Sequence, residues 1–272
     1  MKKHSAQNIL LTGGASGIGA ATAELAVARG HKVVIADINF SGAKRVAKMI
    51  GAGASAIRLD IVSDEQWRNV LDETERRLGR LDVLINNAAI VHTGHSHNVS
   101  SEAHQQTMDV NFMGPLKGML AALPRFKKQG SGHFITVCSM TAFLPFPGLA
   151  SYAASKHALR AFHHGFALEQ RATPIRFSII YPTSTETPML EEEARSDEVT
   201  LAFANPSVTP DKVGNLILDA MEKNSMEVYM PPERARFVRM AGTNPRTLRK
   251  LVVAGEEKGA KNLKSRRAQR RR

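Results

Sequence analysis

A short apolar segment, residues 8–12, runs directly into a glycine-rich turn that extends from Gly13 to Gly19. Glycine allows a tight turn and a close approach of the backbone to a ligand, and the N-terminus of a following helix attracts anions. We therefore predict a strand, a turn and a helix over about 17–29. This order is typical of α/β folds that bind a pyrophosphate at the first turn, although the glycines alone also fit a loop without a ligand. The expected contacts are Gly13, Ser16, Gly17, Ile18 and Gly19.

Apolar segments rich in Val, Ile and Leu alternate with helical segments along the rest of the chain. This alternation predicts an α/β fold, a doubly wound (Rossmann) parallel sheet of seven strands flanked by helices on both faces. The strands are expected near 8–12, 32–36, 55–59, 82–86, 132–138, 175–181 and 226–230. The helices are expected near 17–29, 41–50, 64–78, 101–128, 151–171 and 210–224.

Asp37 ends the second predicted strand, about 20 residues after the glycines. A carboxylate at this place accepts hydrogen bonds from a ribose 2′-OH and repels a 2′-phosphate. Neither the glycine-rich turn nor the residue after Asp37 supplies a Lys or Arg that could bind such a phosphate. The sequence therefore favours NAD(H) over NADP(H) as the cofactor.

Tyr152 and Lys156 lie four residues apart, and Ser139 precedes Tyr152 by thirteen residues. Positions i and i+4 of a helix share one face, so the phenol and the ammonium can reach the same small volume. A nearby cation lowers the pKa of a tyrosine, which is about 10 in isolation. A serine hydroxyl can hold the oxygen of a carbonyl or an alcohol beside the phenol. We predict a proton-transfer site that contains these three residues and works with a hydride carrier.

These motifs make the chain similar to the short-chain dehydrogenase/reductase family over about residues 7–229. They occur in the family's order: Thr12–Gly19, Asp60, Asn86–Ala89, Asn111, Ser139, Tyr152 with Lys156, and Pro182–Thr187. The resemblance implies that Tyr152 is the general acid/base and that Ser139 positions the substrate oxygen. It also implies that Lys156 binds the nicotinamide ribose and lowers the pKa of the tyrosine.

The resemblance implies further roles outside the proton-transfer site. Asp60 and Ile61 would contact the adenine, and Asn87 would line the adenosine ribose. The nicotinamide end of the cofactor would meet Tyr152, Lys156, Pro182 and Thr187. Asn111 would belong to a water-linked proton relay that ends at Lys156. The family usually assembles through the helices that carry Asn111 and Tyr152, which implies a homodimer or homotetramer.

Residues 1–232 are expected to form one dehydrogenase domain, with a substrate lid near 188–209. Long loops beside a site are more often functional than not, although a plain surface insertion also fits this segment. Five residues between Ser139 and Tyr152 either wall a substrate pocket or belong to the core: Phe143, Leu144, Phe146, Pro147 and Leu149. His92, His95 and His97 crowd one loop, but no carboxylate or cysteine joins them at a regular ligand spacing, so we predict no metal site.

The net positive charge of the chain is concentrated at its C-terminus. Residues 233–272 contain 14 Lys or Arg and 3 Glu, a net charge of +11 out of +12 for the whole chain. Residues 234–252 could form a basic amphipathic helix, whereas low apolar content predicts disorder from Lys258 to Arg272. Such an extension could be merely solvated, could contact an anionic membrane surface or an acidic partner, or, with less support, could bind nucleic acid.

The cysteine count, the N-terminal residues and the lengths of the apolar stretches limit where the protein is expected to work. One cysteine cannot form an intrachain disulfide, and the N-terminus lacks the apolar region of a signal peptide, so we predict a cytoplasmic protein. No apolar stretch approaches the roughly 20 residues of a membrane span. We predict an NAD(H)-dependent oxidoreductase that interconverts a secondary alcohol and a ketone. The alternative is a catalytically silent dinucleotide-binding regulator or scaffold that acts through the basic tail. The sequence names neither a substrate nor a reaction direction.

Overall fold

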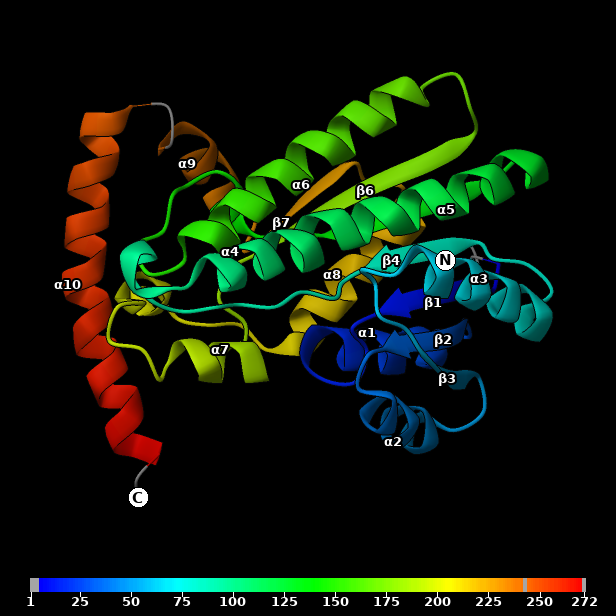
Figure 1. Ribbon diagram of the computed structural model, residues 1–272, viewed down its shortest axis with the longest axis horizontal. Helices are drawn as coiled ribbons and strands as arrows, with labels where there is room; N and C mark the ends of the chain where they lie inside the picture. The colour runs from blue at the N-terminus through cyan, green and yellow to red at the C-terminus, as the bar shows by residue number, and fades with distance from the viewer. Residues whose placement is uncertain (1–4, 242–243, 271–272) are drawn as a thin grey trace.

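The structure is a computed structural model that describes residues 5–241 and 244–270. Seven parallel strands form one sheet in the order β3-β2-β1-β4-β5-β6-β7 (Figure 1). The strands are β1 (Asn8–Thr12), β2 (Lys32–Asp37), β3 (Ala54–Arg58), β4 (Val83–Asn86), β5 (Gly132–Val137), β6 (Ile175–Pro182) and β7 (Glu227–Met230). The order reverses between β1 and β4, which opens a crevice at the carboxyl ends of the strands. The predicted doubly wound sheet is confirmed.

Helices cover both faces of this sheet. One face packs against α1 (Gly17–Ala28), α2 (Phe40–Ile50) and α8 (Pro210–Lys223). The other face packs against α3 (Asp64–Leu78), α5 (Gly114–Gln129) and α6 (Ala150–Glu169). Among the residues that the structure describes, no helix is both long and apolar enough to cross a membrane.

The two cores follow from the alternation of side chains along each strand. Ile9 and Leu11 of β1 belong to the core under α1, α2 and α8, whereas Leu10 belongs to the opposite core. Successive residues of a strand point to opposite faces, so a strand covered on both sides is apolar throughout. This arrangement explains why the strands read as continuous apolar runs in the sequence.

The single helix expected over 101–128 consists of three consecutive segments. They are α4 (Ser101–Met108), a π-helical segment η2 (Asp109–Met113) and α5. Asn111 lies at the centre of η2 and is fully buried. Its Oδ1 accepts a hydrogen bond from the Ile90 N–H at 2.8 Å, and its Nδ2 donates to the Ile90 carbonyl at 2.9 Å. The widened turn therefore ties the helix to the loop after β4, and such π segments frequently occur at functional sites.

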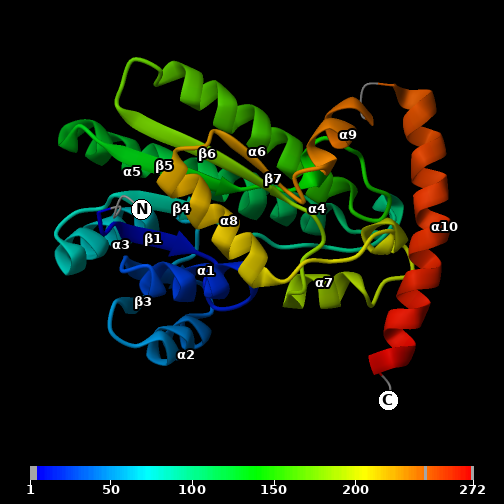
Figure 2. The same cartoon turned by 180° about the vertical axis from the view of Figure 1, so that it is seen from behind.

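The chain after β7 forms two helices, α9 (Arg234–Ala241) and α10 (Pro245–Arg270). The disorder expected from Lys258 onward is wrong up to Arg270, because α10 is continuous over this stretch. Residues 271 and 272 lie outside the described part of the chain. The reason is tertiary: Leu263 is only 3% exposed and packs among residues of the expected lid. Figures 1 and 2 both show α10 along one edge of the molecule, beside the segment that contains α7 (Pro188–Glu193).

Candidate active site

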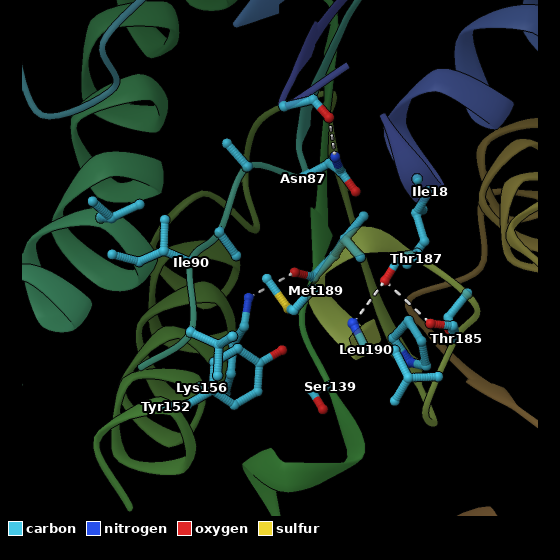
Figure 3. A pocket seen from close by; sticks show the side chains of 18 of the residues that line it. Ile18, Asn87, Ile90, Ser139, Tyr152, Lys156, Thr185, Thr187, Met189 and Leu190 are labelled. Carbon is cyan, nitrogen blue, oxygen red and sulfur yellow. Dashed lines mark hydrogen bonds between the residues drawn. The ribbon is translucent and has the colours of Figure 1, made fainter. Parts of the chain in front are cut away.

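A cavity of about 730 Å³ opens where the strands end (Figure 3). It is lined by loops that follow β1 to β6 and by the expected lid. Most of the residues predicted to contact a cofactor or substrate line it: Gly13, Ser16, Gly17, Ile18, Asp37, Asp60, Ile61, Asn87, Ser139, Tyr152, Lys156, Pro182 and Thr187. Among the described residues predicted for the site, Gly19 and Asn111 lie outside this lining.

The turn after β1 packs against the loop after β4. The Asn87 Nδ2 donates hydrogen bonds to the carbonyl oxygens of Thr12 and Gly13, each at 3.0 Å. In return, the Thr12 Oγ1 accepts from the N–H groups of Asn87 and Ala88 at 3.0 and 3.1 Å. Gly19 supports this contact, because a Cβ at that position would overlap the Gly13 carbonyl oxygen. Gly19 therefore shapes the turn, whereas Gly13 and Asn87 also line the cavity.

The start of α1 and the end of β2 provide the two features that a dinucleotide requires. The N-cap of α1 is Ser16, whose side chain makes no capping bond within the described part of the chain, so the N–H groups of the first turn face the cavity uncapped. The Asp37 carboxylate accepts hydrogen bonds from the N–H groups of Ala15 and Asn39, at 2.9 and 2.8 Å. A positive helix end and a fixed carboxylate at the next strand fit a pyrophosphate and a ribose hydroxyl.

Asp60 and Ile61 follow β3 and are held by bonds within their own loop. The Asp60 Oδ1 accepts from the Val62 N–H at 3.0 Å, and the Asp60 N–H donates to the Gln66 Oε1 at 2.8 Å. The Ile61 carbonyl accepts from the Trp67 Nε1 at 2.9 Å. These bonds hold both residues in the cavity wall, where a flat apolar ring could lie against Ile61.

The predicted proton-transfer residues converge on one side of the cavity (Figure 3). Tyr152 and Lys156 come from α6, and the Lys156 Nζ lies 5.6 Å from the centroid of the Tyr152 ring. Lys156 is 2% exposed and donates from Nζ to the Val137 carbonyl at 3.3 Å. Ser139 follows β5, and its hydroxyl accepts from the Thr141 N–H at 3.2 Å. The three polar groups therefore reach the same volume, from two different elements.

Burial controls the ionisation of this site. It raises the pKa of the Tyr152 phenol well above the usual value, and the charges of Glu193 and Cys138 raise that pKa further, whereas the Ser139 hydroxyl lowers it. Burial also lowers the pKa of Lys156. The lowering of the tyrosine pKa by Lys156 stays a prediction, because desolvation of the phenolate is the largest influence on this group. With its pKa raised, Tyr152 is a phenol that can donate a proton.

Asn111 lies behind the proton-transfer residues. Its Nδ2 is 3.3 Å from the Ser155 Oγ, which in turn donates to the Tyr152 carbonyl at 2.7 Å. Through Ile90 and Ser155, Asn111 joins the loop after β4 to the turn of α6 that carries Tyr152. Its amide thus helps to place this turn.

The expected lid supplies one wall of the cavity. Thr187 is the N-cap of α7, and its Oγ1 accepts from the Leu190 N–H at 3.4 Å and donates to the Thr185 carbonyl at 3.1 Å (Figure 3). The cavity is lined by Thr187, directly before the expected lid, and by the lid residues Pro188, Met189, Leu190, Glu193 and Ala202. A predicted cofactor contact and apolar side chains suited to a substrate thus lie next to each other.

The apolar residues between Ser139 and Tyr152 divide between pocket and core. Leu144, Phe146 and Leu149 line the cavity. Phe143 instead packs against the ring of Tyr181, with ring centroids 4.8 Å apart. The cavity beside Tyr152 is therefore walled by hydrocarbon from two directions, this loop and the lid.

Glu193 is a cavity residue that the sequence analysis did not find. It lies at the end of α7, is 8% exposed, and burial raises its pKa to about 7. In the sequence it is the last of three consecutive glutamates, and no pattern separates it from Glu191 and Glu192. Those two form ion pairs with Arg266 and Arg195. What distinguishes Glu193 is its place at the end of α7, where the fold points it into the cavity.

The three histidines after β4 do not converge on a common centre. The His92 Nδ1 is 3.0 Å from the Thr107 Oγ1, and the His95 Nδ1 lies 3.3 Å from a carboxylate oxygen of Glu198. Within residues 5–241 and 244–270, no group of three or more His, Cys, Asp or Glu side chains is placed to hold a metal ion.

Comparison with known sequences identifies relatives of this arrangement. The short chain dehydrogenase family matches residues 7–198, more than half of the chain. A 2,5-dichloro-2,5-cyclohexadiene-1,4-diol dehydrogenase of Sphingobium indicum is 38% identical over 183 residues, which span 66% of this chain and 73% of the relative. A 3-beta-hydroxysteroid dehydrogenase of Comamonas testosteroni is 31% identical over 219 residues, which span 77% of this chain and 86% of the relative.

Solved structures share the fold over most of the chain. A short-chain dehydrogenase/reductase from Burkholderia phymatum in complex with NAD has a TM-score of 0.81 at 22% identity, covering 89% of this chain and 94% of that one. A 3-ketoacyl-(acyl-carrier-protein) reductase from Brucella melitensis complexed with NADH has a TM-score of 0.74 at 27% identity, covering 82% and 95%. These structures share the fold, and the family match together with the sequence relatives shows that the chain belongs to the short-chain dehydrogenase/reductase family, oxidoreductases that act on CH–OH groups.

Proposed function

We propose that this protein is an NAD(H)-dependent oxidoreductase that interconverts a secondary alcohol and a ketone, with Tyr152 as the general acid/base. One observation carries the proposal: Ser139, Tyr152 and Lys156 line the same cavity as the glycine-rich turn and Asp37. Two relatives are named as dehydrogenases of a cyclic diol and of a hydroxysteroid, which supports an alcohol substrate.

The geometry supports a division of labour among the side chains. A bound nicotinamide would accept or supply the hydride at the substrate carbon. Ser139 holds the substrate oxygen beside Tyr152, which donates its phenolic proton to a ketone oxygen during reduction and accepts the hydroxyl proton during oxidation. The Lys156 ammonium, 5.6 Å from the ring, is the nearby charge that stabilises the phenolate required for oxidation. Asn111, buried behind Ser155, is proposed to support the proton relay that ends at Lys156.

The preference for NAD(H) is proposed from Asp37, which β2 and two backbone N–H groups hold at the cavity. We expect calorimetry to show tight NADH binding and weak NADPH binding by the full chain. Asp37→Ala should lower NADH affinity on the order of tenfold or more, since hydrogen bonds to a charged group are lost. It should also reduce the ratio of NADH affinity to NADPH affinity. Tyr152→Phe is the matched control, because it should bind NADH normally and show no alcohol turnover. If the full chain binds neither cofactor, the proposed function is wrong.

The alternative of a silent scaffold that acts through its basic tail has less support. Arg266 and Arg267 of α10 form ion pairs with Glu186, just before the expected lid, and with Glu191 and Asp197 inside it. These cations are therefore engaged internally, next to a complete set of active-site residues. This placement favours an enzyme whose extension serves its active site.

We also propose a homodimer or homotetramer assembled through α5 and α6. Leu120 on α5 and Leu168 on α6 are 51% and 64% exposed, although both are large and apolar. Burial of such side chains between copies would be favourable. Light scattering coupled to gel filtration should give the mass of two or four chains, and a monomer at micromolar concentration would contradict this assembly.

A further inference from the structure

The expected lid and the two residues before it carry six acidic side chains between residues 186 and 198, and five of them have partners. The pairs are Glu186 and Glu191 with Arg266, Glu192 with Arg195, Asp197 with Arg267, and Glu198 with His95. Glu193 is the exception, since no donor or cation among the described residues is bonded to its carboxyl group. The lid therefore leaves one acidic group unpaired, although arginines are abundant around it.

The unpaired group is also the buried one. Glu193 is 8% exposed and lines the cavity, whereas the side chains of Glu192 and Asp197 are 50% and 86% exposed. A buried carboxyl without a partner costs free energy, so proteins normally pair such groups or leave them exposed. The raised pKa of Glu193 reflects this burial. A bound molecule could supply the missing donor.

Glu193 and Tyr152 line the same cavity, and Tyr152 packs against the apolar cluster that contains Leu190 and Ala194. In agreement with this placement, the Glu193 charge raises the pKa of Tyr152. The buried ammonium of Lys156, which also lines the cavity, donates to the Val137 carbonyl. Apolar side chains also line this cavity, namely Leu144, Phe146, Leu149, Met189 and Leu190, and three of them pack in one cluster with Tyr152. A substrate here would have an apolar body with polar groups at separate points.

We propose that Glu193 is a specificity-determining residue whose carboxyl group binds a second hydrogen-bond donor of the substrate, a hydroxyl or a protonated amine, while Ser139 and Tyr152 hold the reacting oxygen. This inference rests on the proposed alcohol and ketone chemistry and adds the substrate class. The substrate is a largely hydrocarbon diol or amino alcohol. A carboxylate at the same place is repelled by the Glu193 charge.

The test compares matched alcohols on the full chain with NAD⁺. The probes are cyclohexanol, cyclohexane-1,4-diol, 4-aminocyclohexanol and 4-hydroxycyclohexanecarboxylate. We expect the diol and the amino alcohol to exceed cyclohexanol in kcat/KM on the order of ten- to hundredfold, the range for a hydrogen bond to a charged group. The carboxylate should be the poorest substrate. The difference should lie mainly in KM, because Glu193 binds a part of the substrate that does not react.

Variants assign this preference to the carboxyl group. In Glu193→Leu, the diol and the amino alcohol should no longer exceed cyclohexanol in kcat/KM. In Glu193→Gln, the diol should keep most of its higher kcat/KM, whereas the amino alcohol should lose it. Glu192→Gln, at an exposed position on the same helix, should leave all ratios unchanged. If Glu193→Leu does not fold, the selective loss of the amine in Glu193→Gln still tests the proposal.

Binding to the NADH-saturated enzyme, measured by calorimetry, gives a readout without turnover. Equal binding of cyclohexanol, the diol and the amine by the wild type would overturn the inference, and so would the absence of binding by every probe. A donor preference that survives in Glu193→Leu would also overturn it. Each of these results leaves the oxidoreductase proposal intact as long as NADH binds. Failure to bind NADH would contradict the proposed function itself.

Discussion

Glu193 links the active site to the stability of the protein at the scale of a single residue. Its pKa is raised to about 7 from a reference of 4.5. A carboxyl group with a raised pKa stabilises the folded state below the unfolded-state value, and this contribution is lost as the pH rises through about 7. Near pH 5 the group is neutral in the fold, and near pH 8.5 it carries a buried charge.

Glu193→Gln should therefore remove a pH-dependent loss of stability. We expect similar urea midpoints for wild type and variant near pH 5. Near pH 8.5 the variant should have the higher free energy of unfolding, by roughly 3 kcal/mol, since one pKa unit corresponds to about 1.4 kcal/mol. Glu192→Gln should follow the wild type at both values. Parallel curves for Glu193→Gln and wild type would show that Glu193 is not buried as a neutral acid.

Tyr152 gives a second prediction at this scale. Tyr152→Phe removes one hydroxyl and keeps the ring that packs beside Lys156. We expect kcat to fall by roughly 10²- to 10⁴-fold, the usual contribution of a general acid or base, while NADH affinity changes little. Steady-state kinetics and calorimetry on the same preparation separate these two effects. Retention of full turnover would exclude Tyr152 as the proton carrier.

At the scale of elements, α10 is hydrogen-bonded to residues within and just before the expected lid. Arg266 donates to both carboxylate oxygens of Glu186, at 2.7 and 2.6 Å, and to Glu191 at 2.6 Å. These hydrogen bonds lower the pKa of Glu186 to about 2. Gly259 lets the helix approach closely, because a Cβ there would overlap the Thr200 carbonyl oxygen. The helix thus supports the segment that presents Thr187 and Glu193 to the cavity.

Arg266→Ala should loosen the lid and leave the cofactor end intact. We expect KM for the alcohol to rise about tenfold, because two or more charged hydrogen bonds are lost, with little change in NADH affinity. Hydrogen exchange over residues 186–204 should accelerate. Arg266→Lys should bring KM and hydrogen exchange only part of the way back to the wild-type values, since an ammonium cannot pair with a carboxylate in the bidentate manner.

Arg249→Ala supplies the control on the same helix, since Arg249 is exposed. It should leave KM and hydrogen exchange unchanged. An equal change in both variants would mean that α10 acts through its overall charge and not through the Arg266 contacts.

At the scale of the whole molecule, most of the net positive charge belongs to one helix and its end. Residues 245–272 carry eleven Lys or Arg and two Glu, so a chain that ends at Asn244 has a net charge of +3 in place of +12. The cofactor end of the cavity is built from β1, β2 and β3 with their loops, far along the sheet from α10 (Figure 2). We expect this shorter chain to bind NADH and to lose most alcohol turnover. It should also elute from a heparin column at lower salt, because fewer cations contact the polyanion.

Retained NADH binding with lost turnover would show that the extension acts by supporting the lid. If the shortened chain instead keeps full turnover, α10 is dispensable for catalysis and its cations serve another purpose. Circular dichroism with an NADH titration distinguishes a folded chain with an open lid from a chain that has unfolded.

The sequence by itself determined the sheet, the family and the clustering of Ser139, Tyr152 and Lys156. Strand and helix periods are local, and the carboxyl ends of parallel strands must meet at one edge. Asp37 and the glycine-rich turn could be found for the same reason, since each follows directly from its strand.

Only the tertiary structure decided which polar groups are buried and what faces them. In the fold Glu193 is buried, whereas Glu191 and Glu192 form ion pairs with arginines. Burial raises the pKa of Tyr152. The packing of Leu263 against residues of the expected lid orders α10. Burial depends on segments far apart in the chain, so a run of glutamates or a basic tail does not reveal it. Desolvation and ion pairing are set by these distant neighbours, and they determine both the ionisation of the site and the shape of its substrate wall.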